Sequence, residues 1–259
     1  MSTLEPLLPA AEVSDPSVTR ILIRNAQSVR VSTLLQRATA VRPSTSVILT
    51  GTGPINDSLL SDASAWQATG ARLGFFAFDS HNASFATGSA GCLQRSDVAH
   101  QILPAAPGGQ LLGIARAVES SEHEFVVLLS AHSDSLGFLD QCLAQMWIDG
   151  ADVAVLQLDS TGDSETTDSG LAGEGIDAGK QLARWIASSG TQLRNNTTGQ
   201  VCSTQRVVVM RRWVARWLFN EIGRAIDPVE EIADRARLLG VAIAVIGQPP
   251  QQAPPQHPV

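Results

Sequence analysis

Residues 125–134 read F-V-V-L-L-S-A-H-S-D, so that five apolar residues run into three side chains able to do chemistry. The apolar run is typical of a buried strand, and open α/β sheets bind ligands where such strands end. Ser130, His132 and Asp134 fall at that end. A hydrolytic triad is disfavoured, because three residues within five positions cannot easily adopt the geometry of a nucleophile, its base and an orienting group. The stretch predicts either a metal and nucleotide site or the remnant of one.

Two further strand ends carry candidate ligand-binding residues. The predicted strand at 46–50 runs into Thr50, Gly51 and Thr52, where glycine lets a ligand approach the backbone closely. A dinucleotide-binding loop is disfavoured there, because the third glycine of G-x-G-x-x-G is absent. Asp79 ends the run R-L-G-F-F-A-F-D. We expect it either to contact a ligand or to start a plain turn.

A cluster of arginine and tryptophan side chains is the next candidate. Arg211, Arg212 and Arg216 lie beside Trp213 and Trp217 in the sequence, and such a grouping can bind an anion with stacking support. Because the tryptophans are four residues apart, we predict that they pack in the core as part of one buried helical face. In a site without a metal, Arg211 or Arg212 is then expected to face a diphosphate.

These candidates need elements to position them, and the chain alternates β-branched runs with amphipathic segments. We predict strands at 20–24, 46–50, 72–78, 125–129, 151–158, 205–210 and 241–246. We predict helices at 28–41, 58–69, 110–121, 136–150, 180–188, 213–222 and 228–239. Strands separated by helical crossovers indicate an α/β fold, with a single mainly parallel sheet flanked by helices on both faces.

Three segments stand apart from this alternation. Residues 1–17 and 248–259 are rich in proline and polar residues, and we expect both to be flexible extensions of a domain that covers 18–247. Residues 159–179 form a polar loop with almost no apolar content. A loop of this length in a compact domain is usually a functional lid or disordered.

Composition narrows the classes of function. The chain has 259 residues and a net charge of −7, which disfavours nucleic acid as a partner because binding it needs a concentrated basic surface. The longest apolar stretches, such as 240–247, are far shorter than the ~20 residues of a membrane-spanning helix. The N-terminus lacks the basic and apolar regions of a secretory signal, so a cytoplasmic protein is expected.

Two long stretches carry a resemblance to a known family. Residues 109–134 resemble the helix with a central arginine, and the strand ending in Asp-x-Asp, of the family-2 glycosyltransferases. Residues 206–246 resemble the acceptor-side strand, the "R-R" helix, the acidic helix start and the closing strand of the same family. The resemblance implies a GT-A fold of Rossmann-like architecture, with a nucleotide-binding half at 18–158 and an acceptor half at 180–247.

The resemblance also implies a nucleotide-sugar donor at the carboxyl ends of the strands. In that family, Asp-x-Asp carboxylates hold a divalent cation such as Mn²⁺ or Mg²⁺ against the donor diphosphate, because a hard cation prefers oxygen ligands. This chain has Ser130, Ala131 and His132 at those positions. Serine is a poor metal ligand at neutral pH, so His132 and Asp134 are the candidate ligands. Thr50 and Gly51 stand where the family's second strand ends in acidic residues, so we expect an altered metal site or none.

Glu230 and Glu231 are the candidate catalytic bases. They lie near the family's acidic pair, whose carboxylate takes a proton from the acceptor hydroxyl. They also follow Asp227 and Pro228, a favourable N-cap and first helical residue, and acids in a first helical turn stabilise the helix dipole without any catalytic duty. Both roles remain open at this stage.

Two hypotheses for function follow. In the first, the chain is a glycosyltransferase that transfers a sugar from a nucleotide-sugar donor, with Mn²⁺ or Mg²⁺ in an altered site or with no metal. In the second, the same scaffold is catalytically inactive and acts as a binding or assembly partner, with a protein or a second copy of the chain as its partner.

Overall fold

The computed structural model of the protein describes residues 20–25, 43–51, 54–79, 88–104, 109–131, 133, 135–158, 177–189 and 205–247. At residues 20–25, 79, 157, 158, 205 and 247 the description is limited to the backbone. The predicted helix at 28–41, the two predicted extensions and most of the polar loop at 159–179 lie outside these residues.

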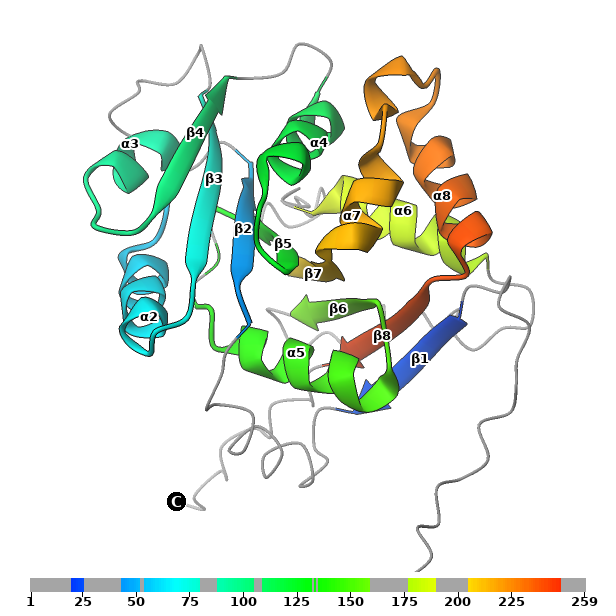
Figure 1. The fold of residues 1–259 in the computed structure, drawn as a ribbon, viewed down its shortest axis with the longest axis horizontal. Coiled ribbons are helices and arrows are strands. Elements are labelled where there is room, and N and C mark those ends of the chain that lie inside the picture. The colour runs from blue at the N-terminus through cyan, green and yellow to red at the C-terminus, as the bar shows by residue number, and fades with distance from the viewer. Residues whose placement is uncertain are drawn as a thin grey trace, which may run out of the picture.

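Eight described strands form one sheet in the order β1-β8-β6-β7-β5-β2-β3-β4 (Figure 1). The strands are β1 (Arg20–Asn25), β2 (Thr45–Thr50), β3 (Leu73–Asp79), β4 (His100–Pro104), β5 (Phe125–Ser130), β6 (Val153–Leu158), β7 (Gln205–Arg211) and β8 (Ala242–Gly247). Neighbours pair in parallel except at β7, which is antiparallel to both β5 and β6. The predicted α/β fold with one mainly parallel sheet is confirmed.

The helices also follow the sequence pattern closely. They are α2 (Asp57–Ala68), α3 (Ser89–Gln94), α4 (Gln110–Ser120), α5 (Phe138–Asp149), α6 (Ala178–Ser188), α7 (Arg212–Phe219), the 3-10 helix η3 (Ile222–Arg224) and α8 (Pro228–Leu239). Each helix predicted within the described residues is present, whereas α3 and β4 were not predicted. None of the helices described is long and apolar enough to cross a membrane.

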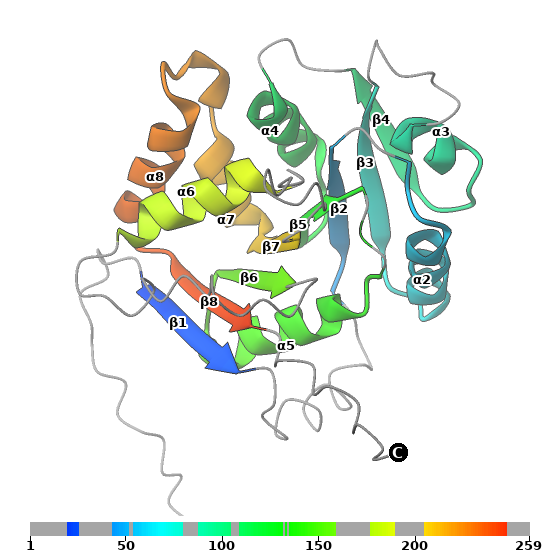
Figure 2. The same cartoon turned by 180° about the vertical axis from the view of Figure 1, so that it is seen from behind.

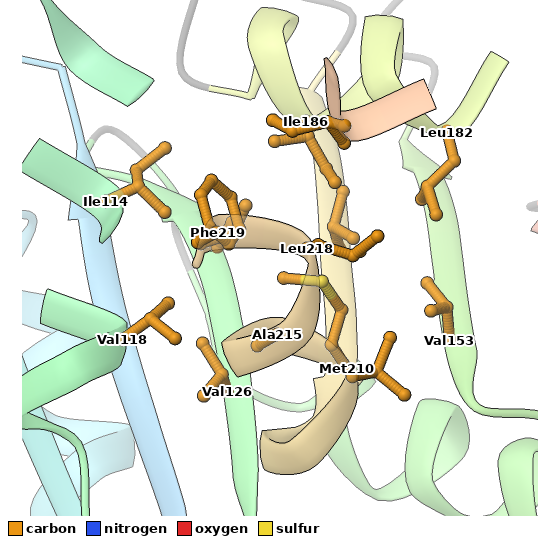
Figure 3. Packing of buried hydrophobic residues seen from close by; sticks show 14 of the residues in the cluster. Ile114, Val118, Val126, Val153, Leu182, Ile186, Met210, Ala215, Leu218 and Phe219 are labelled. Carbon is orange, nitrogen blue, oxygen red and sulfur yellow. The ribbon is translucent and has the colours of Figure 1, made fainter. Parts of the chain in front are cut away.

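The sheet buries side chains on both of its faces. On the central strand β5, Val126 and Leu128 belong to a cluster with α4, α6, α7 and α8, part of which is shown in Figure 3. Val127 and Leu129 belong to a second cluster with α2, α3 and α5. This is the alternation expected of a strand, and it confirms that helices cover both faces. We call the first side the α4/α6 face.

Strand β1 lies at one end of the sheet, and it pairs in parallel with β8 (Figure 2). Strand β2 lies between β3 and β5, and β1 is separated from it by β8, β6, β7 and β5. The central position of β2 matters for function, because ligands of open α/β sheets bind at the carboxyl ends of central strands.

A chain of hydrogen bonds between Ser121, Ser46 and His123 stabilises the edge of the sheet at which the parallel strands begin. The hydroxyl of Ser121 donates to Ser46 Oγ over 2.7 Å, and Ser46 Oγ lies 2.9 Å from His123 Nδ1. A neutral imidazole accepts the Ser46 proton at Nδ1. Gly74 leaves room for the ring, since a Cβ at that position would lie 2.8 Å from its Cε1 atom. We call this the amino edge of the sheet.

Acidification is expected to destabilise the fold through His123. Burial and then Arg72 lower the pKa of His123 below its ordinary value of 6.5, Arg212 adds to the lowering, and Glu122 opposes it. The unfolded chain therefore takes up this proton first as the pH falls through 6.5. The contribution of His123 is complete above that pH and is lost progressively below it.

Urea unfolding between about pH 7.5 and about pH 5.5 measures this effect. His123→Gln keeps a hydrogen-bonding group but does not titrate, so its unfolding free energy should fall less over this interval than that of the wild type. Equal losses of unfolding free energy in the wild type and in His123→Gln would exclude His123 as the source of the pH dependence.

Candidate functional site

Three polar residues lie in a row where the central strands meet the carboxyl edge of the sheet. Thr50 at the end of β2 pairs with Ser130 at the end of β5. On the other side of β5, the pairing with the antiparallel β7 ends at Leu128 and Val208, and the same register continued by two residues brings Ser130 level with Arg206. We call Thr50, Ser130 and Arg206 the central row.

The three side chains of the central row share one face of the sheet. Ile48, Leu128 and Val208, each two residues away from a member of the row, all pack in the cluster beneath α4 and α6. Because side chains alternate along a strand, Thr50, Ser130 and Arg206 also belong to the α4/α6 face. The contact from Arg206 Nη1 to Ser188 Oγ of α6, at 3.4 Å, agrees with this placement.

The two hydroxyl residues of the row are buried in a tightly bonded strand end. Thr50 Oγ1 donates to the Leu129 carbonyl over 3.1 Å, and the Thr50 carbonyl accepts from Ala131 N at 3.0 Å. The turn beyond β5 is closed by a bond of 3.0 Å from Ser133 N to the Ser130 carbonyl. This part of the site is therefore preorganised by its backbone.

The ends of two helices stand at the same edge. Helix α4 begins after Gly109, which has a φ of 97° and provides no side-chain cap. Gln110, its first residue, donates from Nε2 to the carbonyl of Ser189 at the end of α6. This hydrogen bond ties the start of α4 to the end of α6, the helix whose Ser188 contacts the central row.

Helix α2 holds the chain that leads from β5 into α5. Asp62 accepts at Oδ2 from Ser135 Oγ over 2.6 Å and from Leu136 N over 2.9 Å. Ser135 Oγ in turn accepts from Gly137 N at 2.9 Å. Asp62 thus anchors the start of α5 against α2, a few residues beyond Ser130.

Arg206 was not singled out from the sequence. It is half-buried, and its Nε atom is buried without a hydrogen-bond partner among the described residues. The available signal was an arginine immediately before the apolar run V-V-V-M. That signal places Arg206 at the carboxyl edge only once β7 is known to run antiparallel to its neighbours.

For several candidate residues from the sequence, the structure does not describe the side chain. His132, Asp134 and Thr52 lie outside the described residues, and Asp79 is described only as the end of β3. Within the described part of the chain, no group of three or more histidine, cysteine, aspartate or glutamate side chains is placed to hold a metal ion. Ser130 and Ala131 occupy the strand end itself, so the described residues do not fit a carboxylate-held cation.

Arg211 and Arg212 lie at the amino edge, away from the central row. Arg211 pairs in register with Phe125 at the start of β5, and its Nε atom is 3.8 Å from Asp152 Oδ1. Its guanidinium stands 5.8 Å from the centre of the Phe125 ring. Arg212 donates from Nη1 to the Glu122 carbonyl over 3.2 Å. The structure does not bring these arginines together with Thr50 and Ser130.

The prediction that Trp213 and Trp217 pack in the core was wrong. They are 52% and 50% exposed, respectively. The buried side of α7 is formed instead by Val214, Leu218 and their neighbours Ala215 and Phe219. Residues 213 and 217 have helical spacing, and so do residues 214 and 218. The second pair faces the sheet.

Glu230 and Glu231 are engaged at the start of α8. Asp227 caps the helix, accepting at Oδ1 from Val229 N at 3.0 Å and Glu230 N at 3.2 Å. Glu230 Oε1 lies 3.2 Å from Lys180 Nζ, and Glu231 Oε1 accepts from Arg235 Nε at 2.7 Å. This arrangement is the one expected of acids that stabilise a helix start.

The two glutamates are also separated from the central row along α6. The ion pair of Glu230 is with Lys180, in the first turn of α6, whereas Arg206 contacts Ser188, the last residue of that helix. Eight residues of α-helix separate the two points by about 12 Å along the helix axis. The proposed base and the central row therefore meet opposite ends of α6.

No known protein family matches the sequence. No curated protein matches it either. Among solved structures, the chain is similar to 4-diphosphocytidyl-2C-methyl-D-erythritol synthase from Anaerococcus prevotii, with 8% identity, a TM-score of 0.47 and coverage of 80% of this chain and 90% of that one. It is similar to glucosyl-3-phosphoglycerate synthase from Mycobacterium tuberculosis, solved with Mn²⁺ and UDP-glucose, with 14% identity, a TM-score of 0.46 and coverage of 92% and 80%.

A third similar structure is 2-C-methyl-D-erythritol 4-phosphate cytidylyltransferase from Thermus thermophilus, with 13% identity, a TM-score of 0.44 and coverage of 84% and 94%.

Proposed function

We propose that the chain binds a nucleotide-sugar at the carboxyl edge of its sheet, with the donor diphosphate over the central row, and transfers the sugar to an acceptor. The observation that carries the proposal is the row itself. Thr50, Ser130 and Arg206 lie side by side on three adjacent strands and on one face, and the two hydroxyl residues end central parallel strands. Central strand ends of this kind are where open α/β sheets bind ligands.

The polar groups around the row suit a phosphorylated ligand. The guanidinium of Arg206 is a donor of the kind that proteins use for phosphate oxygens, whereas the buried Thr50 hydroxyl already donates to the Leu129 carbonyl. Helix α4 begins at the same edge without a side-chain cap, so its first N–H groups and its positive dipole end are turned toward this edge of the sheet. No carboxylate-held cation is part of the proposal.

A second candidate function is nucleotide binding without sugar transfer. One observation favours it: Glu230 and Glu231, the carboxylates expected to act as the base, are engaged in ion pairs with Lys180 and Arg235. In both side chains Oε1 is already engaged with a cation, so this oxygen is not free to accept a proton from an acceptor.

Calorimetric titration tests the shared part of both functions. A panel of UDP-sugars and GDP-sugars is titrated into the full chain, once with Mn²⁺ and once with EDTA. We expect at least one donor to bind, with an affinity in EDTA similar to that in Mn²⁺. Absence of binding across the whole panel under both conditions would refute the proposal.

Release of free nucleoside diphosphate from the bound donor distinguishes the two candidates. Sugar transfer, to an acceptor or to water, should release the diphosphate at a rate proportional to protein concentration. Binding with no release over many hours would favour the function without transfer.

A further inference from the structure

We infer that Arg206 is the residue that binds the phosphate groups of the ligand, and that its guanidinium takes the place of a carboxylate-held cation in this site. The inference rests on the proposed function, since it names the group that would hold the donor diphosphate. Arg206 is suited to this role by its position, by the state of its guanidinium and by having no carboxylate within ion-pair distance among the described residues.

Position is the first argument. Strand β7 runs opposite to its neighbours, so its first residues lie where the parallel strands end. Arg206 is the second residue of β7 and pairs with Gln157 of β6, and it lies two residues beyond the last pair between β7 and β5, Val208 with Leu128. A positive side chain is thereby placed in the middle of the carboxyl edge, near the end of β5.

The unfilled hydrogen-bonding capacity of the guanidinium is the second argument. Arginine has five N–H donors, and among the described residues the Arg206 side chain makes one hydrogen bond, from Nη1 to Ser188 Oγ at 3.4 Å. Its buried Nε has no partner among the described residues. Buried donors are rarely left without an acceptor, and phosphate oxygens bound in a bidentate manner would satisfy Nε and an Nη atom together.

Charge is the third argument. Arg211, Arg224, Arg235 and Arg237 each lie within 4.0 Å of a carboxylate. Arg206 makes no such ion pair with the described residues. A half-buried arginine that has no carboxylate partner among the described residues favours an anionic ligand.

The role in transfer follows from where negative charge appears. The bond between the anomeric carbon and the phosphate oxygen breaks, and its electron pair stays on the departing nucleoside diphosphate. The acceptor oxygen bonds to the same carbon and releases its proton to solvent. Arg206 stabilises the charge that accumulates on the departing diphosphate, which is the task a cation performs in metal-dependent transfer.

The test uses the full chain, with inorganic pyrophosphate and UDP-glucose as probes in EDTA, and repeats the UDP-glucose titration with Mn²⁺ in place of EDTA. Arg206→Gln removes the charge, and Arg206→Lys keeps a charge but loses the bidentate geometry. Arg211→Gln is the matched control, because it removes an arginine from the same strand at the amino edge. Thermal unfolding of each variant verifies that it is folded.

We expect wild type and Arg211→Gln to bind pyrophosphate equally. Arg206→Gln should bind it about 10- to 100-fold more weakly, the usual loss for a hydrogen-bonded charge pair. Arg206→Lys should show an intermediate loss, and it also serves as the test variant if Arg206→Gln does not fold. Removal of the unpartnered Nε should leave the unfolding temperature of Arg206→Gln unchanged or raised.

Failure of the inference and failure of the proposed function give different results. If UDP-glucose binds equally to wild type and Arg206→Gln, or only when Mn²⁺ is supplied, the inference is overturned and the proposed function stands. If pyrophosphate binding depends on Arg206 but no nucleotide-sugar binds, the anion site is supported and the proposed function fails. If wild type binds neither probe, both fail.

Discussion

Trp185→Ala is expected to lower the free energy of unfolding by about 3–5 kcal/mol, as large-to-small changes of buried aromatic residues do. Trp185 lies on the inner side of α6 and is only 2% exposed. Its indole packs in the cluster between α6 and the sheet, so truncation leaves a cavity that the surrounding strands cannot fill. The same helix contributes Ser188, so loosening α6 should also disturb the partner of Arg206.

Trp147→Ala is the matched control for this prediction. Trp147 lies on α5 and is 75% exposed, so the same chemical change should alter the free energy of unfolding by no more than about 0.5 kcal/mol. Urea unfolding of both variants measures the difference. A similar loss in both would show that α6 does not cover the core as described.

Gly179→Ala is expected to destabilise the protein by about 1–3 kcal/mol, the usual cost of overpacking a filled interface. A Cβ at this position would lie 2.6 Å from the carbonyl oxygen of Ala233, and that oxygen belongs to the α8 backbone. Helices α6 and α8 would have to separate, which weakens the ion pair between Asp177 and Arg237 that links them. Alanine normally favours a helix over glycine, so the sign of this prediction is informative.

Gly88→Ala provides the control, because a Cβ at Gly88 would have no atom within 4 Å. We expect Gly88→Ala to change the free energy of unfolding by less than about 1 kcal/mol. Gly88 is the N-cap residue of α3, and no side-chain hydrogen bond caps that helix. Urea unfolding at a fixed pH compares the two. A stabilised Gly179→Ala variant would contradict the close approach of α6 to α8.

The contribution of the Asp177–Arg237 ion pair to stability also depends on pH. The hydrogen bond from Arg237 holds the pKa of Asp177 below its ordinary value of 3.8. Both side chains are about one-third exposed, so solvent screens the pair and its contribution is small. It is present above the ordinary pKa of aspartate and is lost as the pH falls below it.

Elements marked by local signals were predicted well. Asp227 and Pro228 indicate the start of α8 in the sequence, and Asp227 caps that helix as expected. Gly240 ends the same helix with a φ of 64°, a conformation that glycine adopts without strain. The apolar run at 125–129 forms a strand buried on both faces. In each case residues close in sequence determine the outcome.

Features that depend on distant pairing were not predicted. The direction of β7 is set by its partners β5 and β6, and this direction moves Arg211 to the amino edge and Arg206 to the carboxyl edge. The place of β1 beside β8 is likewise a matter of pairing across most of the chain. On α7, residues 213 and 217 compete with 214 and 218 for the buried side, and the sheet decides between them.

The surroundings of Ser130 were predicted only in part from the sequence. Its position at the carboxyl edge was predicted, and Thr50 does lie beside it. The neighbour that gives the site its charge, Arg206, comes from a segment 76 residues further along the chain. Ser130 and Arg206 therefore come from distant parts of the sequence, and only the folded chain brings them to the same edge of the sheet.

Hydrogen–deuterium exchange with saturating UDP-glucose in EDTA tests the central claim most directly, because it locates the ligand on the sheet. Binding at the carboxyl edge should slow exchange in peptides that contain Gly51, Ala131 and Arg206. Peptides from the amino edge, containing Glu124 and Arg212, should exchange as they do without ligand. Protection confined to the amino edge, or no protection anywhere, would contradict a nucleotide site over the central row.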